Sequence, residues 1–504
     1  MDTELYSVAQ VRAIERSAAA RLAPGELMRR AGEAAAAYAL ELLGGFPTGV
    51  VLVLAGPGNN GGDALEVAAN LANLGAAVAV VHLAGSAPSD ETQRALERAR
   101  ASRARFIDSI GDDIGEDSGN SIADAACCLV VDGLFGIGLA RPLAGRARAL
   151  AERIAGSGCP VLALDVPSGL DADTGAVVGP DGFAVTATHT ITFLGNKPGL
   201  HTGDGTDHAG RVHVDRLGTE ASEPAQARLN GPQLFAAHLA ARRRNTHKGS
   251  FGDVAVLGGA RGMAGAAVLA ARAALFAGGG RVFVAALDSG LGIDPSQPEI
   301  MFRDAAGFAF EKRTIVAGPG MGDADLAKHL LAKAIDGTGP IVLDADALNL
   351  AAASEDLQAR IARHAGPAIV TPHPLEAARL LGVTAAIVQA DRLENARELA
   401  QRLNAVVVLK GAGSVIARPD GAVAINTTGN PGLATGGTGD VLAGLCGALL
   451  GQGWPAWEAA LGAVWLHGAA ADRLVDAGIG PIGMTAGELP RAIRAELNAL
   501  IAQR

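Results

Sequence analysis

Short apolar runs alternate with alanine-rich stretches along the first half of the chain, and this alternation predicts strands and helices in turn. The strand-like runs read VVLVLAG, AVAVVHLAG, CCLVVDGLFG, PVLALDVPSG and THTITFLG. Between the first two stands DALEVAANLANLG, a stretch with the apolar spacing of a helix. Strands that alternate with helices in this way are typical of a parallel sheet covered by helices. The first half therefore predicts a Rossmann-like α/β/α sandwich.

The same alternation returns after a polar, proline-bearing segment, RLGTEASEPAQARLNGPQ, at residues 216–233. We expect a first domain at residues 1–218, a linker at 219–230 and a second domain at 231–504. The later runs DVAVLGG, GRVFVAAL, RTIVAGPG, PIVLDADAL, AIVTPHP, AVVVLKGAG and GAVAIN predict a second parallel sheet. In both halves, glycine- and aspartate-rich turns follow the strands, at the edge where open α/β sheets bind ligands. The predicted fold class is α/β with two domains and two active sites.

A glycine cluster in the second half stands directly before an aspartate. Residues 426–444 read NTTGNPGLATGGTGDVLAG, and Gly436, Gly437 and Gly439 let backbone N–H groups approach a ligand closely. The apolar run that follows predicts a helix whose first-turn amides would hold a phosphoryl group. Asp440 would then accept a proton from a hydroxyl that attacks phosphorus. The structural alternative is a glycine turn with Asp440 as a helix cap.

Three glycine-bearing loops follow strands in the first half: LAGPGNNGGD at 54–63, VDGLFGIGLARP at 131–142 and LDVPSGL at 164–170. The first of them leads into a helix and suits a pyrophosphate. Asn60, Asp132 and Ser168 offer oxygen ligands for a hard cation, and Asp165 is a spare carboxylate near it. Turn-capping roles for Asn60 and Ser168 are the alternative.

Composition excludes several classes of protein. A length of 504 residues exceeds one ordinary domain, and a formal charge of −10 argues against a general nucleic-acid binder. No stretch reaches about 18 uninterrupted apolar residues, and the amino terminus lacks an apolar signal core, so we expect no membrane insertion or export. The four cysteines, Cys127, Cys128, Cys159 and Cys446, lack metal-ligand spacing. We therefore expect a cytoplasmic enzyme.

The motifs AGPGNNGGDALEVAANL, VDGLFGIGLARP and DVPSGLDADTG resemble the NAD(P)H-hydrate epimerase domain over about the first 215 residues. This resemblance implies a potassium ion held by Asn60, Asp132 and Ser168. It also implies that the hydrated cofactor is contacted by Asn59, Asn60, Gly61, Gly62, Asp63, Gly136, Ile137, Gly138, Leu139, Ala140, Arg141, Pro142 and Asp165. Asp165 is our candidate for the general acid and base. The sequence departs from the family at Ala64 and Glu66, where glycine and a small or apolar residue are more common.

The second half carries THKGSFGDVAVLGGARGMAGAAVLAARAALFAGGG, GPGMG, DADALN, TPHPLEAARLLG and KGAGS together with GNPGLATGGTGD. This combination resembles the ADP-dependent NAD(P)H-hydrate dehydratase, a member of the ribokinase-like superfamily, over roughly residues 231–500. The resemblance implies that the adenine nucleotide is contacted by Lys410, Gly411, Ala412, Gly413, Ser414 and Gly439. It implies that the hydrated nicotinamide is contacted by Ala266, Gly320, His373 and Asp440.

The resemblance also implies why a dehydratase would use kinase chemistry. Hydroxide leaves a saturated carbon poorly, whereas a phosphate ester leaves well, so phosphorylation would precede elimination. Magnesium would bridge the nucleotide phosphates, with Glu376 as a water-mediated ligand or, alternatively, as a first-turn glutamate stabilised by the helix dipole. His373 is either a structural turn residue or a substrate contact. Asp344 and Asp346 either pair with other loops or cap the next helix.

The two resemblances together imply a bifunctional repair enzyme that epimerises the R and S hydrates of NADH and NADPH, called NADHX and NADPHX below. It would dehydrate the S form at the expense of ADP, giving AMP and phosphate. We also expect a homo-oligomer, although small apolar helix faces could pack within or between chains. Two alternatives are a ribokinase-like kinase that acts on a vitamin precursor and an N-terminal half that serves only as a binding scaffold. The sequence does not decide between ADP and ATP as the preferred nucleotide, or between NADHX and NADPHX as the preferred substrate.

Overall fold

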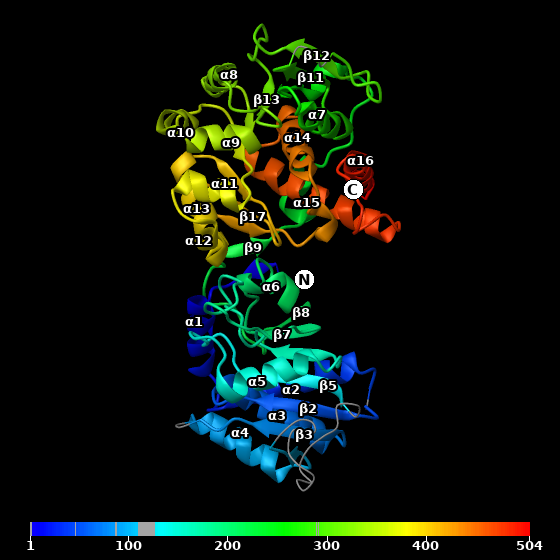
Figure 1. The fold of residues 1–504 in the computed structure, drawn as a ribbon. Coiled ribbons are helices and arrows are strands. Elements are labelled where there is room, and N and C mark those ends of the chain that lie inside the picture. Colours follow the sequence, from blue (N-terminus) through cyan, green and yellow to red (C-terminus); the bar gives the residue numbers. More distant parts are fainter. Residues whose placement is uncertain are drawn as a thin grey trace. The chain divides into compact units, whose positions relative to one another are not determined.

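The computed structural model divides the chain into two compact units, Met1–Ala227 and Arg228–Arg504 (Figure 1). It describes residues 3–45, 47–85, 88–108, 127–288, 290 and 292–503. Each unit contains a largely parallel sheet with helices, so the predicted α/β class with two domains is confirmed. No helix among these residues is long and apolar enough to cross a membrane.

The first unit is a three-layer sandwich around the sheet β4-β3-β2-β5-β6-β7-β8, in which every neighbouring pair is parallel. Its strands are β1 (Glu4–Leu5), β2 (Val50–Ala55), β3 (Ala77–His82), β4 (Arg105–Phe106), β5 (Cys127–Gly133), β6 (Val161–Leu164), β7 (His189–Phe193) and β8 (Arg211–Asp215). Its helices are α1 (Val8–Ala19), α2 (Glu26–Leu42), α3 (Asn59–Asn73), α4 (Asp90–Ala101), α5 (Gly145–Ala155), α6 (Gly205–His208) and the 3-10 turn η2 (Pro198–Leu200). Side chains alternate along β2: Val51 and Val53 pack with α1 to α4, whereas Leu52 and Leu54 pack with α5. The five strands expected from the sequence are all present.

Helix α3 differs from the expectation, because it begins at Asn59 rather than after the NNGGD segment. The segment forms the first turn of the helix, and two close approaches explain why glycines stand there. A Cβ on Gly61 would lie 1.8 Å from the Gly56 carbonyl oxygen, and one on Gly62 would lie 2.6 Å from Met28 Cε. The glycines thus let α3 start directly above the end of β2.

The second unit has the strand order β9-β18-β17-β16-β15-β14-β13-β10-β11-β12. These strands are β9 (Ala227–Leu229), β10 (Asp253–Gly258), β11 (Arg281–Ala286), β12 (Met301–Asp304), β13 (Thr314–Ala317), β14 (Ile341–Leu343), β15 (Ala368–Val370), β16 (Val406–Leu409), β17 (Val415–Ala417) and β18 (Val423–Ile425). The expected parallel sheet contains one strand that was not expected, β17, which runs antiparallel to both β16 and β18. Residues 410–414 join β16 to β17, and so short a connection suits a hairpin, whereas a parallel crossover needs a dozen residues or more.

Helices cover this sheet, and two of them form its most tightly packed layer. They are α7 (Ala264–Phe276), α8 (Asp325–Ile335), α9 (Ala345–Ala352), α10 (Glu355–Ala362), α11 (Pro374–Leu381), α12 (Ala385–Ala390), α13 (Arg392–Leu403), α14 (Thr438–Gly451), α15 (Ala456–Asp476) and α16 (Leu489–Ala502), with 3-10 turns η3 (Pro232–Leu234), η4 (Ala236–His238), η5 (Lys248–Phe251) and η6 (Pro431–Leu433). Helices α7 and α14 lie side by side (Figure 1). A Cβ on Gly444 would lie 2.0 Å from the Ala270 carbonyl oxygen, so the two backbones touch. This packing fixes the position of the helix that begins at the GGTGD turn.

The polar segment expected as a linker, residues 219–230, contains β9. Arg228 and Leu229 pair with Ala424 and Ile425 of β18, and the side chain of Asn230 donates to Asn426 Oδ1 and to the Leu461 carbonyl. The end of this segment is therefore built into the second unit. The domain boundaries proposed from the sequence stay predictions.

Candidate functional sites

A cavity of about 690 Å³ opens where the first unit's sheet meets the start of α3. Its lining includes Asn59, Asn60, Asp63 and Asp165 together with residues 134–139. Five other predicted contacts are absent from this lining. Gly61 and Gly62 pack against Gly56 and Met28, and Ala140, Arg141 and Pro142 are exposed beyond the end of the loop. The structure thus brings Asn59, Asn60 and Asp63 of the first predicted loop and residues 134–139 of the second together with Asp165.

Asp165 is ion-paired, so the expectation of a spare carboxylate was wrong. Its Oδ1 accepts a hydrogen bond from the ammonium of Lys197, which is completely buried. The same ammonium donates to Thr192 Oγ1 at 2.8 Å and to the Phe193 carbonyl at 2.7 Å, so its three protons are all used. Asp165 Oδ2 has no hydrogen-bond partner among the described residues, and the carboxylate lines the cavity. The sequence did not single out Lys197, because one lysine after a strand carries no motif that would mark it as part of a site.

Asp132, Ser168 and Asn60 gather around the short segment that follows β5. Ser168 donates from Oγ to Asp132 Oδ1 at 2.7 Å and from its backbone nitrogen to Oδ2 at 2.9 Å. Burial raises the pKa of Asp132, which is fully buried, and no lysine or arginine of the described residues pairs with it. The side-chain nitrogen and oxygen of Asn60 are buried without a hydrogen-bond partner in the part of the chain that the structure describes. A Cβ on Gly136 would lie 3.4 Å from Asn60 Oδ1, which places that amide against the same loop.

Two acidic side chains that the sequence did not single out share the cavity with Asp63. They are Glu15 on α1 and Glu91 on α4, and Glu91 also accepts a hydrogen bond from the Gly25 backbone at 2.9 Å. Burial, with the nearby Asp165 and Glu15 carboxylates, raises the pKa of Asp63 well above its usual range. Burial, with Asp165 and Glu91, also raises that of Glu15. Asp63 and Glu15 therefore resist ionisation in this cavity.

The structure explains why a glutamate is accommodated at position 66, where the epimerase family more often has a small or apolar residue. Its side chain is buried on α3 and pairs with the Arg98 guanidinium of α4, whose Nε donates to Oε1 at 2.8 Å. A charged residue at this position is thus compensated by a partner on the neighbouring helix.

In the second unit, Asp440 lies in the first turn of α14, directly behind the left-handed Gly437 (φ 93°). Burial, together with the Asp344 and Asp346 carboxylates, raises the pKa of Asp440 to about 6, although the Lys410 ammonium opposes the shift. Its carboxylate accepts no side-chain or backbone hydrogen bond from the described residues. A half-buried carboxyl with a pKa close to neutrality suits proton transfer at physiological pH.

Lys410, directly after β16, lies within ion-pair distance of two acidic groups of this site. Its Nζ lies 2.7 Å from Asp344 Oδ1 and 3.9 Å from Glu376 Oε2. A Cβ on Gly439 would lie 3.4 Å from the same nitrogen, so the ammonium stands directly beside the turn that precedes Asp440. Burial raises the pKa of Glu376 to about 7 despite Lys410. Asp344 pairs with another loop, as one of the two sequence interpretations proposed.

His373 and Glu376 form a capping box at the start of α11. His373 Nδ1 accepts from the Leu375 nitrogen at 3.1 Å, while Glu376 Oε2 accepts from the His373 nitrogen at 2.7 Å. Burial and the Lys410 charge lower the pKa of His373, which suits an acceptor role for Nδ1. The ring is nonetheless about half exposed and its Nε2 lies 3.3 Å from Glu376 Oε1, beside the Lys410 cluster. The structural role is therefore present, and contact with substrate stays a prediction.

The GPGMG loop meets the beginning of α7, which brings two predicted substrate contacts together. Gly320 has a left-handed φ of 57°, and a Cβ there would lie 3.2 Å from Ala266 Cβ. The end of the same loop contacts Asp346, because the Gly322 nitrogen donates to Asp346 Oδ2 at 2.8 Å. Gly320 and Ala266 thus adjoin the loops around Asp440.

The predicted nucleotide contacts, residues 410–414, form the hairpin loop between β16 and β17. The Gly411 nitrogen donates to Ser414 Oγ at 3.3 Å, which closes the loop. Below it lies Arg392, a buried guanidinium that donates to the Leu409 and Lys410 carbonyls, both at 3.2 Å. Sequence reasoning missed Arg392, which stands as an ordinary arginine at the start of α13.

Two residues of α15 hold the glycine-rich segment in place. His467 Nε2 lies 3.0 Å from the Thr438 carbonyl, and burial lowers the pKa of His467 to about 4, so the neutral ring donates from Nε2. Asp472 accepts from the Gly429 nitrogen at 2.8 Å and from Asn430 Nδ2 at 2.9 Å. Helix α15 therefore holds the glycine-rich segment at two points, one before the GGTGD turn and one within it.

Comparison with known proteins agrees with this division of the chain. The family model for the YjeF-related protein N-terminus matches residues 24–199, and the one for NAD(P)H-hydrate dehydratase matches residues 254–494. A bifunctional NAD(P)H-hydrate repair enzyme of Escherichia coli is 37% identical over 486 residues, covering 94% of this chain and 89% of the relative. Its counterpart in Coxiella burnetii is 37% identical over 509 residues, covering 98% and 100%.

Among solved structures, the ADP/ATP-dependent NAD(P)H-hydrate dehydratase of Bacillus subtilis, crystallised with ATP and Mg²⁺, is 32% identical with a TM-score of 0.48. The match covers 54% of this chain and 97% of the Bacillus subtilis chain. The sequence relatives match across both units, and each unit matches its own family model. The chain belongs to the family of bifunctional NAD(P)H-hydrate repair enzymes.

Proposed function

We propose that the first unit interconverts the R and S hydrates of NADH and NADPH, and that the second dehydrates the S hydrate with ADP, releasing AMP and phosphate. One observation carries the second assignment. Asp440 stands behind a glycine turn and beside Lys410, with an unpartnered carboxylate and a pKa raised to about 6. A base, a cation and free helix amides thus meet at one place, which suits phosphoryl transfer to a hydroxyl.

In the proposed dehydration, the Asp440 carboxylate takes the proton of the substrate hydroxyl as its oxygen attacks the β-phosphorus of ADP. The first-turn amides of α14 and the Lys410 ammonium stabilise the negative charge on the transferred group. Phosphate then departs from the ring carbon, while the ring nitrogen supplies the electron pair. Loss of a proton from the adjacent ring carbon completes the elimination and restores the reduced nicotinamide. The pair between Lys410 and Asp344 keeps the ammonium charged and oriented.

Magnesium is the cation that we propose for this site. Glu376 is a buried carboxyl, and burial raises its pKa to about 7. A nearby cation would stabilise the ionised form of such a carboxyl. Glu376 would hold the ion through water, and the ion would neutralise charge on the nucleotide phosphates.

In the proposed epimerisation, Asp165 is the general acid and base. Lys197 holds Oδ1, so the partner-free Oδ2 is the oxygen that exchanges a proton with the hydroxyl of the hydrate. Carboxyl groups at Asp63 and Glu15 are suited to remain protonated and to donate to the substrate, because the pKa of each is raised. Lys197 acts through Asp165 and is therefore a positioning residue.

Potassium is the ion that we propose for the Asn60, Asp132 and Ser168 group. The fit rests on the buried Asn60 amide, which lacks a partner, and on the fully buried Asp132 carboxylate, which lacks a cationic one. A monovalent ion would satisfy both and would organise the loop at residues 134–139. A homo-oligomeric state and a cytoplasmic location stay predictions.

The proposal is tested by incubating the full chain with both hydrate epimers, ADP and magnesium, and by following the return of reduced nicotinamide absorbance. Complete consumption of both epimers supports it, and consumption of neither contradicts it. Replacing ADP with ATP in the same assay decides which nucleotide is preferred.

A further inference from the structure

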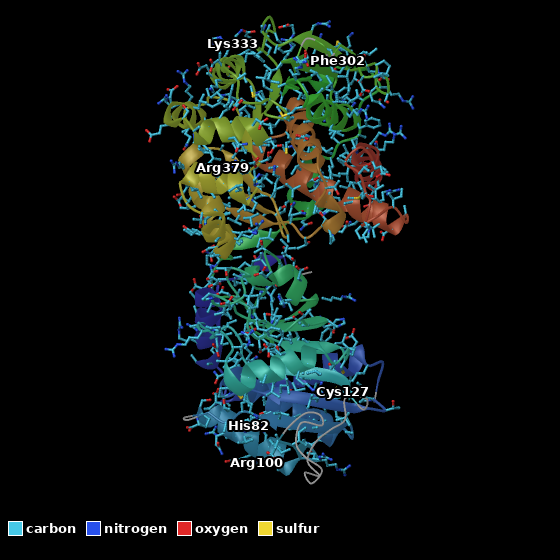
Figure 2. The ribbon with its side chains drawn as sticks, in the orientation of Figure 1. His82, Arg100, Cys127, Phe302, Lys333 and Arg379 are labelled. Carbon is cyan, nitrogen blue, oxygen red and sulfur yellow. The ribbon has the colours of Figure 1, made fainter. Side chains whose placement is uncertain are left out.

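Two cysteines that the proposed function does not use lie in contact at the edge of the first unit. Cys127 begins β5, and Cys159 stands just before β6. Their sulfur atoms are 3.1 Å apart, and both side chains are half-buried (Figure 2, which labels Cys127). Both thiols are therefore adjacent and open to a small reagent.

The neighbouring strands place both thiols on the same side of the sheet. Strands β5 and β6 are adjacent and parallel, with Val130 registered against Val161. Cys127 and Cys159 pack against the apolar cluster that contains these valines, whereas Cys128 packs against the cluster on the opposite face. Cys128 Sγ lies 3.4 Å from the Val50 carbonyl instead. The chain thus contains its own matched control cysteine.

The distance of 3.1 Å between the two sulfur atoms shows that the side chains already meet, as a disulfide requires. The two sulfur atoms would have to move together by roughly 1 Å to reach bonding distance. Side-chain rotation supplies a movement of this size without a shift of the backbone.

We propose that Cys127 and Cys159 form a disulfide when the chain meets a low-molecular-weight disulfide such as oxidised glutathione. One protein thiolate attacks a sulfur of the reagent and expels one glutathione thiolate. The second protein thiolate attacks the resulting mixed disulfide and expels the other glutathione. The reagent is reduced by two electrons, the two cysteines are oxidised, and the two thiol protons pass to the released glutathiones.

The new bond would tie together the amino ends of the two strands that lead to Asp132 and Asp165. Burial and the neighbouring Cys127 raise the pKa of Cys159 to about 12, so this thiol is almost wholly protonated at neutral pH and reacts slowly. We therefore expect oxidation over hours rather than seconds. A bridge between these strands should raise the melting temperature of the first unit by about 5–10 °C.

The test treats the full chain with oxidised glutathione, quenches it with acid, and alkylates it in denaturant. Intact mass spectrometry should show two alkylated cysteines where the untreated chain has four. Trypsin cleaves between the two cysteines at Arg146 and Arg153, so only a disulfide keeps their peptides together.

The link should persist in Cys128→Ser and disappear in Cys127→Ser and in Cys159→Ser, with folding of each variant checked by circular dichroism. The wild-type result stands even if a variant fails to fold. Four alkylated cysteines after full exposure, glutathione adducts without the linked peptide, or a link that survives Cys127→Ser would each overturn the proposal.

Discussion

The buried ammonium of Lys197 donates to Asp165 Oδ1 and leaves the other carboxylate oxygen without a partner among the described residues. The pairing occupies one oxygen of Asp165 and leaves Oδ2 as the oxygen available to the cavity that the residue lines. The ion pair therefore links the stability of the first unit to its proposed chemistry.

Replacing Lys197 with methionine should destabilise the chain by about 3–5 kcal/mol, because it leaves the Asp165 carboxylate, which is only 14% exposed, without its cation. Urea unfolding measures this change. Arg216→Met is the matched control, since its ion pair with Glu4 is more exposed and 3.4 Å long, and it should cost less than about 1 kcal/mol. Equal losses in the two variants would show that the Lys197 pair contributes nothing special.

Glu376→Gln should make the second unit more stable at pH 8 than the wild type, by up to about 3 kcal/mol. The pKa of Glu376 is raised from its ordinary value of 4.5 to about 7. The folded chain therefore holds this proton more tightly than the unfolded chain, and the wild type loses that stability as the pH rises through about 7. The glutamine amide oxygen can still accept from the His373 nitrogen. Unfolding free energies at pH 5 and pH 8 check the prediction, and a gap between the two proteins that is independent of pH would count against it.

The rate of dehydration should depend on pH through Asp440. Because its pKa is raised to about 6 and the base must be ionised, kcat/KM should rise tenfold per pH unit below about 6 and level off above it. The Glu376 carboxyl titrates close by and broadens the curve. Measuring kcat/KM between pH 5 and pH 8.5 tests this, and a rate that falls across the interval would exclude Asp440 as the base.

Potassium chloride should raise the melting temperature of the wild type relative to the same concentration of tetramethylammonium chloride. The effect should vanish in Asn60→Ala, because that amide is buried without a partner. Asn73→Ala, at the exposed end of the same helix, is the control and should keep the effect. Identical potassium shifts in both variants would argue against the proposed ion site.

Much of the architecture could be read from the sequence because buried parallel strands leave continuous apolar runs. Most strands of both cores were predicted for this reason, whereas β8 (RVHVD) and the edge strand β12 (MFRD) carry too many polar residues to stand out. The antiparallel β17 was missed altogether, because its three residues, Val415–Ala417, form too short an apolar run to stand out. Its direction follows from the short loop at residues 410–414.

The predicted site residues were those on glycine-rich loops, because glycine marks a close approach of the backbone. The residues that sequence reasoning missed, such as Lys197, Arg392 and Glu91, are single charged side chains on helices or after a strand. Each acts through a partner that is distant in the sequence, such as Asp165 for Lys197. Only the folded chain brings these pairs together.

The central claim is that two sites on one chain act in sequence, with Asp165 serving the first and Asp440 the second. The decisive measurement gives each epimer separately, with ADP and magnesium, to the wild type, Asp165→Asn and Asp440→Asn. Asp420→Asn, an exposed aspartate paired with Arg418, serves as the control and should behave as the wild type.

We predict that Asp440→Asn slows the restoration of reduced nicotinamide at least about 100-fold from either epimer while still converting R to S. Asp165→Asn should dehydrate the S epimer at the wild-type rate and leave the R epimer nearly untouched. Restoration of reduced nicotinamide by Asp440→Asn at the wild-type rate would contradict the account.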